Sequence, residues 1–208
     1  MWQKTDGIPF SYRGDLTVEQ NKNDRRTQRT ERALKDALAE LLIEKGLSKI
    51  TVREITDKAD INRVTFYKHY LDVYDLYEQI EKEILVDLGL IVLEYGEIST
   101  AEIFKHLVDY VDDNRMLFRM VFSPNTTSAL MEKVAGLIEG ISRKVLTEKY
   151  HVELNKYNID YLNYYRAYGA IAIIDKWVME DFVQPKEDVV RTVSELDAHV
   201  AAYIHSVI

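Results

Sequence analysis

Residues 50–76, ITVREITDKADINRVTFYKHYLDVYDL, decide the fold of this chain. Thr51 and Glu54 have the spacing of a capping box, which marks the start of a helix. Asn62 is a favourable N-cap for a second helix, and Asp60 tolerates the left-handed conformation that a sharp turn requires. The stretch therefore predicts two short helices joined by a tight turn, with a further helix beginning at Asp72.

The second of these helices, over about residues 63–70, is too short to be stable alone, yet it is rich in hydrogen-bond donors. A short helix of this kind, held by a partner across a turn, is typical of a helix-turn-helix that binds DNA. We call these two short helices and their turn the reader. Residues at the start of a recognition helix enter the major groove, so Arg63 and Thr65 are expected at base edges. Tyr67, Lys68 and His69 follow and are expected to contact phosphates.

Residues 51–72, TVREITDKADINRVTFYKHYLD, resemble the DNA-binding signature of the TetR family of transcriptional regulators. The positions that carry this resemblance are Thr51, Val52, Ile55, Ala59, Thr65, Phe66, Tyr67, His69 and Tyr70. With the flanking helices the resemblance covers about residues 26–88. Two positions depart from the family pattern: Asp60 replaces the usual turn glycine, and Val73 replaces a frequent lysine that contacts a phosphate.

The resemblance and the hydrophobic periodicity together predict an all-α protein of about nine helices. We expect a flexible N-terminal arm over residues 1–23 and a helix-turn-helix DNA-binding domain over residues 24–71. A helical domain for effector binding and dimerisation is expected over residues 72–208. Its fourth helix, from Asp72 to about Tyr95, links the two parts of the chain.

The charge distribution favours DNA binding by the N-terminal part, although the whole chain has a net charge of −8. Residues 1–71 hold 14 basic and 11 acidic residues, whereas residues 72–208 hold 13 and 24. A positive field is needed only where the protein meets DNA. Arg26 and Arg29 belong to a basic cluster before the reader and, with Thr51, Arg53 and Asn62, complete the expected contacts to a double-stranded operator.

The last two predicted helices, over about residues 155–181 and 186–207, favour a homodimer. Small residues on the first allow close approach, and apolar residues on the second recur with a heptad-like spacing. A single short reader also gains affinity from a second copy. The expected interface residues are Gly169, Ala172, Ile173, Val193, Leu196, Val200 and Tyr203.

The segment NRMLFRMVFSPN, with Gly169 and Trp177, resembles a C-terminal domain common in TetR-type regulators of Gram-positive bacteria. Some relatives respond to small molecules and others act with a protein partner. Aromatic side chains with polar tips suit a ligand cavity, but they also suit an ordinary core, and His106 also fits a hydrogen-bonded structural role. The candidate pocket residues are Phe104, His106, Phe118, Met120, Phe122, Tyr165 and Tyr168.

Several functional classes find no support in the sequence. The absence of cysteine excludes disulfides and thiolate metal sites. No glycine-rich phosphate loop, nucleophile elbow or HExxH spacing is present, so we expect no catalytic residue, cofactor or metal site. No apolar run reaches membrane-spanning length, and the N-terminus lacks a signal-peptide core, so the sequence predicts a cytoplasmic protein without a membrane partner.

Two functional hypotheses follow. The first is a dimeric TetR-type repressor, controlled through its C-terminal domain by a small molecule or a protein partner. The alternative is a TetR-like interaction protein that acts through a protein partner as a co-activator, or that has lost operator binding. The reader helix and the basic cluster favour the first hypothesis, and Val73 and the acidic total favour the second.

Overall fold

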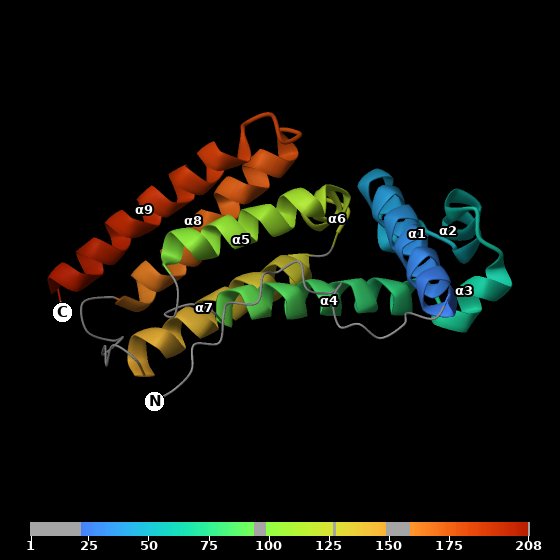
Figure 1. Ribbon diagram of the computed structural model, residues 1–208, viewed down its shortest axis with the longest axis horizontal. Coiled ribbons are helices and arrows are strands. Elements are labelled where there is room, and N and C mark those ends of the chain that lie inside the picture. Colours follow the sequence, from blue (N-terminus) through green and yellow to red (C-terminus); the bar gives the residue numbers. More distant parts are fainter. Residues whose placement is uncertain (1–21, 94–98, 127, 149–158, 208) are drawn as a thin grey trace.

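The computed structural model describes residues 22–93, 99–126, 128–148 and 159–207, and the described chain is all-helical, as predicted (Figure 1). The predicted arm lies outside the described residues, except for its last two, which open the first helix. A short 3-10 helix, η1, covers Leu47–Lys49. The α-helices are α1 (Lys22–Glu44), α2 (Val52–Ala59), α3 (Arg63–His69), α4 (Val73–Leu93), α5 (Thr100–Asp113), α6 (Arg115–Val121), α7 (Ser128–Glu148), α8 (Ile159–Met179) and α9 (Lys186–Val207).

Helices α1, α2 and α3 form a head at one end of the molecule, and the remaining helices form an elongated body (Figure 1). Helix α4 runs from the head into the body, where it packs against α5 and α7. Helix α8 packs against α7 and α9, and α9 also packs against α5. The short α6 lies at the head end of the body and packs against α1. The head and the body therefore share α1 as a common surface.

The core of the head is the apolar stripe of α1. Leu34, Leu38 and Leu42 repeat every four residues and are fully buried. Ile55 of α2 and Phe66 of α3 are buried as completely in the same core. Because α2 and α3 have only eight and seven residues, their stability comes from this packing rather than from helix propensity.

Helix α4 begins where the sequence predicts. The Asp75 amide donates to the Asp72 side chain at 2.9 Å, and the Leu71 amide donates to the Asp75 carboxylate at 2.8 Å. The hydrogen bond from Leu71 lowers the pKa of Asp75. Two amides that lack intrahelical partners are thus satisfied, and this fixes the angle at which α4 leaves the reader.

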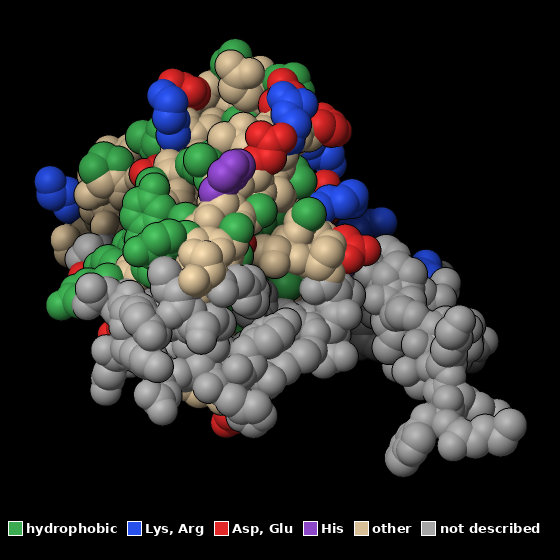
Figure 2. Space-filling model, turned by 90° about the vertical axis from the view of Figure 1, so that its left-hand side faces the viewer, with side chains coloured by type: hydrophobic (Ala, Val, Ile, Leu, Met, Phe, Trp, Pro, Cys, Tyr) green, Lys and Arg blue, Asp and Glu red, His purple; other side chains and the backbone are tan. Residues whose placement is uncertain are grey.

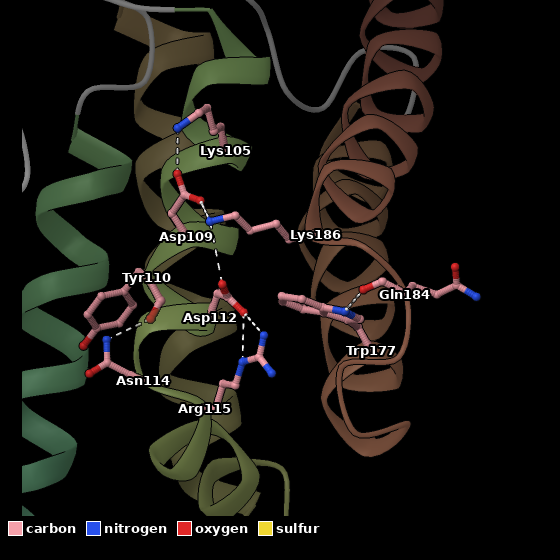
Figure 3. A network of polar contacts seen from close by, with 9 residues as sticks. All are labelled: Lys105, Asp109, Tyr110, Asp112, Asn114, Arg115, Trp177, Gln184 and Lys186. Atoms are coloured by element: carbon pink, nitrogen blue, oxygen red, sulfur yellow. Dashed lines mark hydrogen bonds and ion pairs between the residues drawn. The ribbon is translucent and has the colours of Figure 1, made fainter.

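A polar network ties the start of α9 to α5 (Figure 3). Lys186 lies 2.7 Å from Asp109 and 3.6 Å from Asp112, and Lys105 also contacts Asp109 at 2.7 Å. Burial would raise the pKa of Asp109, but the hydrogen bonds from Lys105 and Lys186 outweigh it and lower that pKa. Nearby, the Trp177 indole donates to the Gln184 carbonyl at 2.8 Å and closes the turn between α8 and α9. This end of the body is held by charge as well as by apolar packing.

The turn between α2 and α3 depends on Asp60. This residue has φ 53° and ψ 45°, the left-handed conformation. Its amide and that of Ile61 donate back to carbonyls in the last turn of α2, including Ile61 N to Thr56 O at 2.9 Å. The predicted sharp turn is therefore present, with aspartate in a conformation that glycine adopts at lower cost.

Replacing Asp60 with glycine is expected to stabilise the protein by roughly 0.5–1 kcal/mol, because the left-handed strain is removed and the gain exceeds the added entropy of the unfolded chain. Urea unfolding monitored by circular dichroism measures this change. The matched control is Asp57→Gly, inside α2 and exposed, which should destabilise by about 1 kcal/mol. Destabilisation by both glycines would show that the turn is not strained.

Candidate nucleic-acid interface

Helix α3 is anchored on one side and open on the other. The Val64 amide donates to the Asn62 side chain at 2.8 Å, which confirms Asn62 as the N-cap. Phe66 is fully buried and packs edge-on against Tyr67. Arg63, Val64, Tyr67 and Lys68 are exposed. The last three lie one, four and five residues after Arg63. The four side chains therefore form one contiguous face that a groove of DNA could receive.

The other two predicted residues of α3 lie differently. Thr65 is half-buried at the edge of this face. His69 is also half-buried, with its Nδ1 atom 3.3 Å from the Glu31 carboxylate of α1. The His69 ring therefore fixes the end of α3 to α1. Val73, at the position of the frequent family lysine, is buried in the core and offers no contact to DNA.

On α2, the predicted contact residues are engaged within the helix. The Glu54 amide donates to Thr51 Oγ1 at 3.3 Å, and the Thr51 amide donates to the Glu54 carboxylate at 3.0 Å, so the predicted capping box is present. Lys45 also contacts Glu54 at 2.5 Å. Arg53 is exposed and pairs with Asp57 at 3.4 Å. Because that pair is mostly exposed, Arg53 remains able to exchange Asp57 for a phosphate.

The predicted basic cluster lies in the first turns of α1, where Arg25, Arg26 and Arg29 are all exposed. The contact between Glu31 and His69 brings this part of α1 beside the end of α3. Cationic side chains at a helix N-terminus add to the positive end of the helix dipole. This arrangement costs helix stability and creates a positive field that favours phosphate.

The sequence reasoning missed Val64. This residue, at the second position of α3, is 66% exposed although it lies beside the cations of the open face. Apolar residues on recognition helices contact the methyl group of thymine. The sequence did contain a signal for this role, because Val64 is an apolar residue among the polar side chains on one side of the predicted helix.

The body contains an apolar cavity of about 90 Å³. Phe104, Phe118 and Phe122 line it, as the sequence suggested. Met120 is fully buried elsewhere in the body, and His106 is half-buried on α5 without lining the cavity. The lining also includes residues of α4, α7, α8 and α9 that the sequence reasoning did not name, such as Leu88, Val92, Val134, Ile138, Ser142, Asn163, Arg166, Ile174 and Asp197.

Tyr165 and Tyr168, two of the candidate pocket residues, do not line this cavity. These residues are 62% and 37% exposed, and the Tyr168 ring stacks on Tyr164 with centroids 4.1 Å apart. The inward positions of α8 are occupied instead by Asn163, Ala167 and Ile174. Figure 2 shows hydrophobic side chains gathered on one side of the end of the body that lies away from the head.

The predicted dimer residues lie along a groove of about 260 Å³ between α8 and α9. Gly169, Ile173, Val193, Leu196 and Val200 line it. Ala172 and Tyr203 are exposed on the same two helices. The apolar seam of α9 is divided: Val189 and Val193 are buried, whereas Leu196 and Tyr203 are more than half exposed.

Two absences hold for the described part of the chain. No group of three or more metal-ligating side chains is positioned to hold a metal ion there. None of the helices described combines the length and apolarity needed to cross a membrane.

Comparison with known families agrees with this geometry. Residues 34–80 match bacterial regulatory proteins of the tetR family, and residues 99–196 match a transcriptional regulator C-terminal region. The chain belongs to the TetR family of transcriptional regulators.

Two relatives illustrate the family. The chain is 25% identical over 173 residues to the HTH-type transcriptional regulator YxbF of Bacillus subtilis, which covers 80% of the chain and 44% of that protein. It is 25% identical over 157 residues to the TetC protein of transposon Tn10 in Escherichia coli, which covers 69% of the chain and 78% of that protein. The chain therefore spans less than half the length of the first relative.

Solved structures show the same fold. A TetR regulator from Streptococcus agalactiae has a TM-score of 0.57 at 20% identity, covering 84% of this chain and 97% of the other. The fatty acid degradation regulator FadR from Bacillus halodurans has a TM-score of 0.59 at 17% identity, with coverages of 81% and 94%. The dihydroxyacetone kinase operon activator DhaS has a TM-score of 0.53 at 17% identity, with coverages of 83% and 97%.

The capping box gives the head a specific pH dependence. Hydrogen bonds from Lys45 and then Thr51 lower the pKa of Glu54 from 4.5 to about 2. Ionised Glu54 therefore stabilises the head above pH 4.5, and this contribution is lost as the pH falls towards 2. We expect Glu54→Gln to lower the midpoint of thermal unfolding at pH 7, and the difference from wild type to vanish near pH 2.

The control for this measurement is Glu132→Gln, an exposed residue of α7 outside any cap. Its effect should stay small across the same pH range. A constant difference between Glu54→Gln and wild type from pH 7 to pH 2 would contradict a role for the ionised carboxylate.

Proposed function

We propose that the protein is a dimeric DNA-binding repressor whose operator affinity is controlled through its body. The observation that carries this proposal is the open face of α3, where Arg63, Val64, Tyr67 and Lys68 project from a helix anchored by Phe66. Two cations and two apolar side chains on one face of a short, anchored helix suit the phosphates and base edges of a major groove.

The position of each side chain suggests its role on DNA. Arg63 and Val64, in the first turn of α3, face base edges, and Val64 suits a thymine methyl group. Thr65 supports this turn from its edge. Tyr67 and Lys68 lie further along and contact phosphates, with Arg26, Arg29 and Arg53 on the flanking backbone. His69 acts by fixing α3 to α1.

The groove between α8 and α9 supports a two-fold dimer. Tyr165 and Leu196, which line the groove with Gly169, are 62% and 53% exposed, and Tyr203 on the same helix as Leu196 is 55% exposed. A second copy of the same surface would cover these groups, as isologous interfaces do. Two readers would then meet half-sites about 34 Å apart along the duplex, or multiples of that spacing.

A conformational change in the body can reach the head through two helices. Helix α4 leaves the reader directly, and α6, which lines the cavity through Phe118 and Phe122, packs against α1. After α6, the Asn125 amide donates to the Ile43 carbonyl at 2.9 Å, at the end of α1. An effector that moves α6 thereby shifts α1, and a coupling of about 1–3 kcal/mol changes operator affinity by roughly 5–150-fold.

A protein-partner mechanism is the second candidate. Residues 72–208 hold 24 acidic residues against 13 basic ones, and the solvent-exposed Tyr161 and Tyr164 extend the apolar surface of α8. One structure of the same fold is named an operon activator. A mobility-shift assay with DNA from upstream of the coding region, over a salt series, separates the two functions, because an interaction protein without operator affinity shows no salt-dependent shift.

For the reader, Arg63→Ala should relax discrimination between matched and mismatched operators by roughly 1–3 kcal/mol at one base pair, because a bidentate base contact is lost. Lys68→Ala should instead weaken binding to all sequences alike and lower the salt slope by about one. Fluorescence anisotropy on both operators measures these effects.

The matched control is Lys176→Ala, which removes an exposed cation from the body. It should leave binding to both operators unchanged. Equal loss of discrimination from Arg63→Ala and Lys68→Ala would contradict this division of roles.

For the dimer, Leu196→Glu should produce a monomer in analytical ultracentrifugation at micromolar concentration, because it places a charge in an apolar interface. Leu90→Glu on α4 is the matched control, since Leu90 is 55% exposed and Leu196 is 53% exposed. A dimer that survives Leu196→Glu would place the interface elsewhere.

A further inference from the structure

The apolar cavity of the body has two chemically different ends. Phe118 and Phe122 of α6 and Met131 at the start of α7 close the end beside the head. Ser142, Asn163, Arg166 and Asp197 line the cavity as well. These polar residues come from the later half of α7, the first turns of α8 and the middle of α9. The cavity therefore combines an apolar part next to α6 with a polar cluster contributed by α7, α8 and α9.

The polar end is built from buried, mutually bonded side chains. Asn163 is 1% exposed, its carbonyl accepts from the Ser142 hydroxyl at 2.5 Å, and its amide donates to the Glu139 carbonyl at 3.2 Å. Asp197 is 7% exposed and holds Arg166 through two bonds, at 2.6 and 2.8 Å. Four polar side chains at one end of an apolar cavity are the kind of feature that orients a ligand.

The hydrogen-bonding capacity that remains fits a hydroxyl group. An amide nitrogen carries two hydrogens, and the bond from Asn163 to Glu139 uses one of them. The Ser142 oxygen and the Asp197 carboxylate each retain acceptor capacity beyond the bonds named above. A ligand hydroxyl both donates and accepts, so it can bond an acceptor and Asn163 together, whereas a carbonyl group can only accept.

The formal charges that line the cavity are paired. Among the described lining residues only Arg166 and Asp197 carry formal charge, and they form an ion pair with each other. An anionic ligand would bring a second negative charge beside Asp197, and a cation would bring a second positive charge beside Arg166. Burial of such an unbalanced charge is strongly unfavourable, so the site favours an uncharged molecule.

The volume limits the size of the ligand. The cavity measures about 90 Å³. A dry cavity of about 150 Å³ is known to admit benzene, which has six non-hydrogen atoms, so the present one suits a ligand of roughly four non-hydrogen atoms. Larger, charged effectors with several polar groups do not fit this space.

We propose that the effector of this protein is a short, uncharged alcohol, with its hydroxyl group bound at Ser142, Asn163 and Asp197 and its apolar chain directed toward Phe118 of α6. This inference rests on the proposed control of operator affinity through the body. It also gives that control a physical route, because Arg166 and Asp197 line both the cavity and the groove between α8 and α9. The cavity thus borders the groove through Arg166 and Asp197, and it is also lined by Phe118 of α6, the helix that packs on α1.

The test uses three probes with the same three-carbon chain: propan-1-ol, propanoate and propylammonium. Titration calorimetry on the full chain at pH 7 should show saturable binding of propan-1-ol, at least about tenfold tighter than either ion, since only the ions bury an unbalanced charge. Comparable binding of all three probes, or tighter binding of an ion, overturns the proposal.

Two variants locate the site. Ala167→Phe fills the cavity from its α8 wall and should abolish binding of propan-1-ol, whereas Ala101→Phe on the exposed side of α5 should not. Should Ala167→Phe fail to fold, Asn163→Leu keeps the side-chain size and removes the polar anchor, so it should weaken propan-1-ol binding about tenfold. Unchanged binding in the folded variants overturns the assignment of the site.

Operator binding is measured in the same samples, so the two proposals can fail separately. Saturable binding of propan-1-ol that leaves operator affinity unchanged supports the ligand class and contradicts control through this cavity. Release of the operator by another molecule, with no binding of propan-1-ol, contradicts the ligand class and leaves control through the body standing.

Discussion

The burial of α1 on two sides is the constraint on which the rest of the structure depends. Its residues Leu34, Leu38 and Leu42 are fully removed from solvent, and the helix packs against both α2 and α6. The two reader helices are too short to persist without this support. The orientation of the reader is therefore fixed by the same helix that meets the body, and the two parts cannot move independently.

The C-terminus of α1 shows how closely the head and body are joined. The last carbonyl groups of a helix have no intrahelical partners and require other donors. Here the Ser123 hydroxyl lies 3.4 Å from the Leu42 carbonyl, and the Asn125 amide donates to the Ile43 carbonyl, both from the turn after α6. Lys35 of α1 also pairs with Glu83 of α4. These polar contacts are directional, so a shift of α6 changes hydrogen-bond geometry at α1 as well as apolar packing.

The body keeps several polar groups inside an otherwise apolar assembly. Burying the Arg166–Asp197 pair is costly, and such a pair is weak evidence for stability by itself. The pair instead contributes to specificity of packing, because a bidentate contact fixes the angle and register of α8 against α9. It also separates the cavity from the groove on the outer face. A group bound on the inner side thus lies one side chain away from the surface proposed for dimerisation.

The sequence by itself determined the elements whose signals lie within a few residues. The Thr51–Glu54 box, the Asn62 and Asp72 caps and the left-handed turn at Asp60 are all formed by side chains and backbone groups within a few residues of one another, so no distant partner was needed to predict them. The tertiary structure alone decided which faces are covered. It turned Tyr165 and Tyr168 outward, placed Asn163 inward and paired His69 with Glu31, 38 residues away. Helical periodicity groups side chains on a face, but which neighbouring helix covers that face depends on packing between segments far apart in the chain.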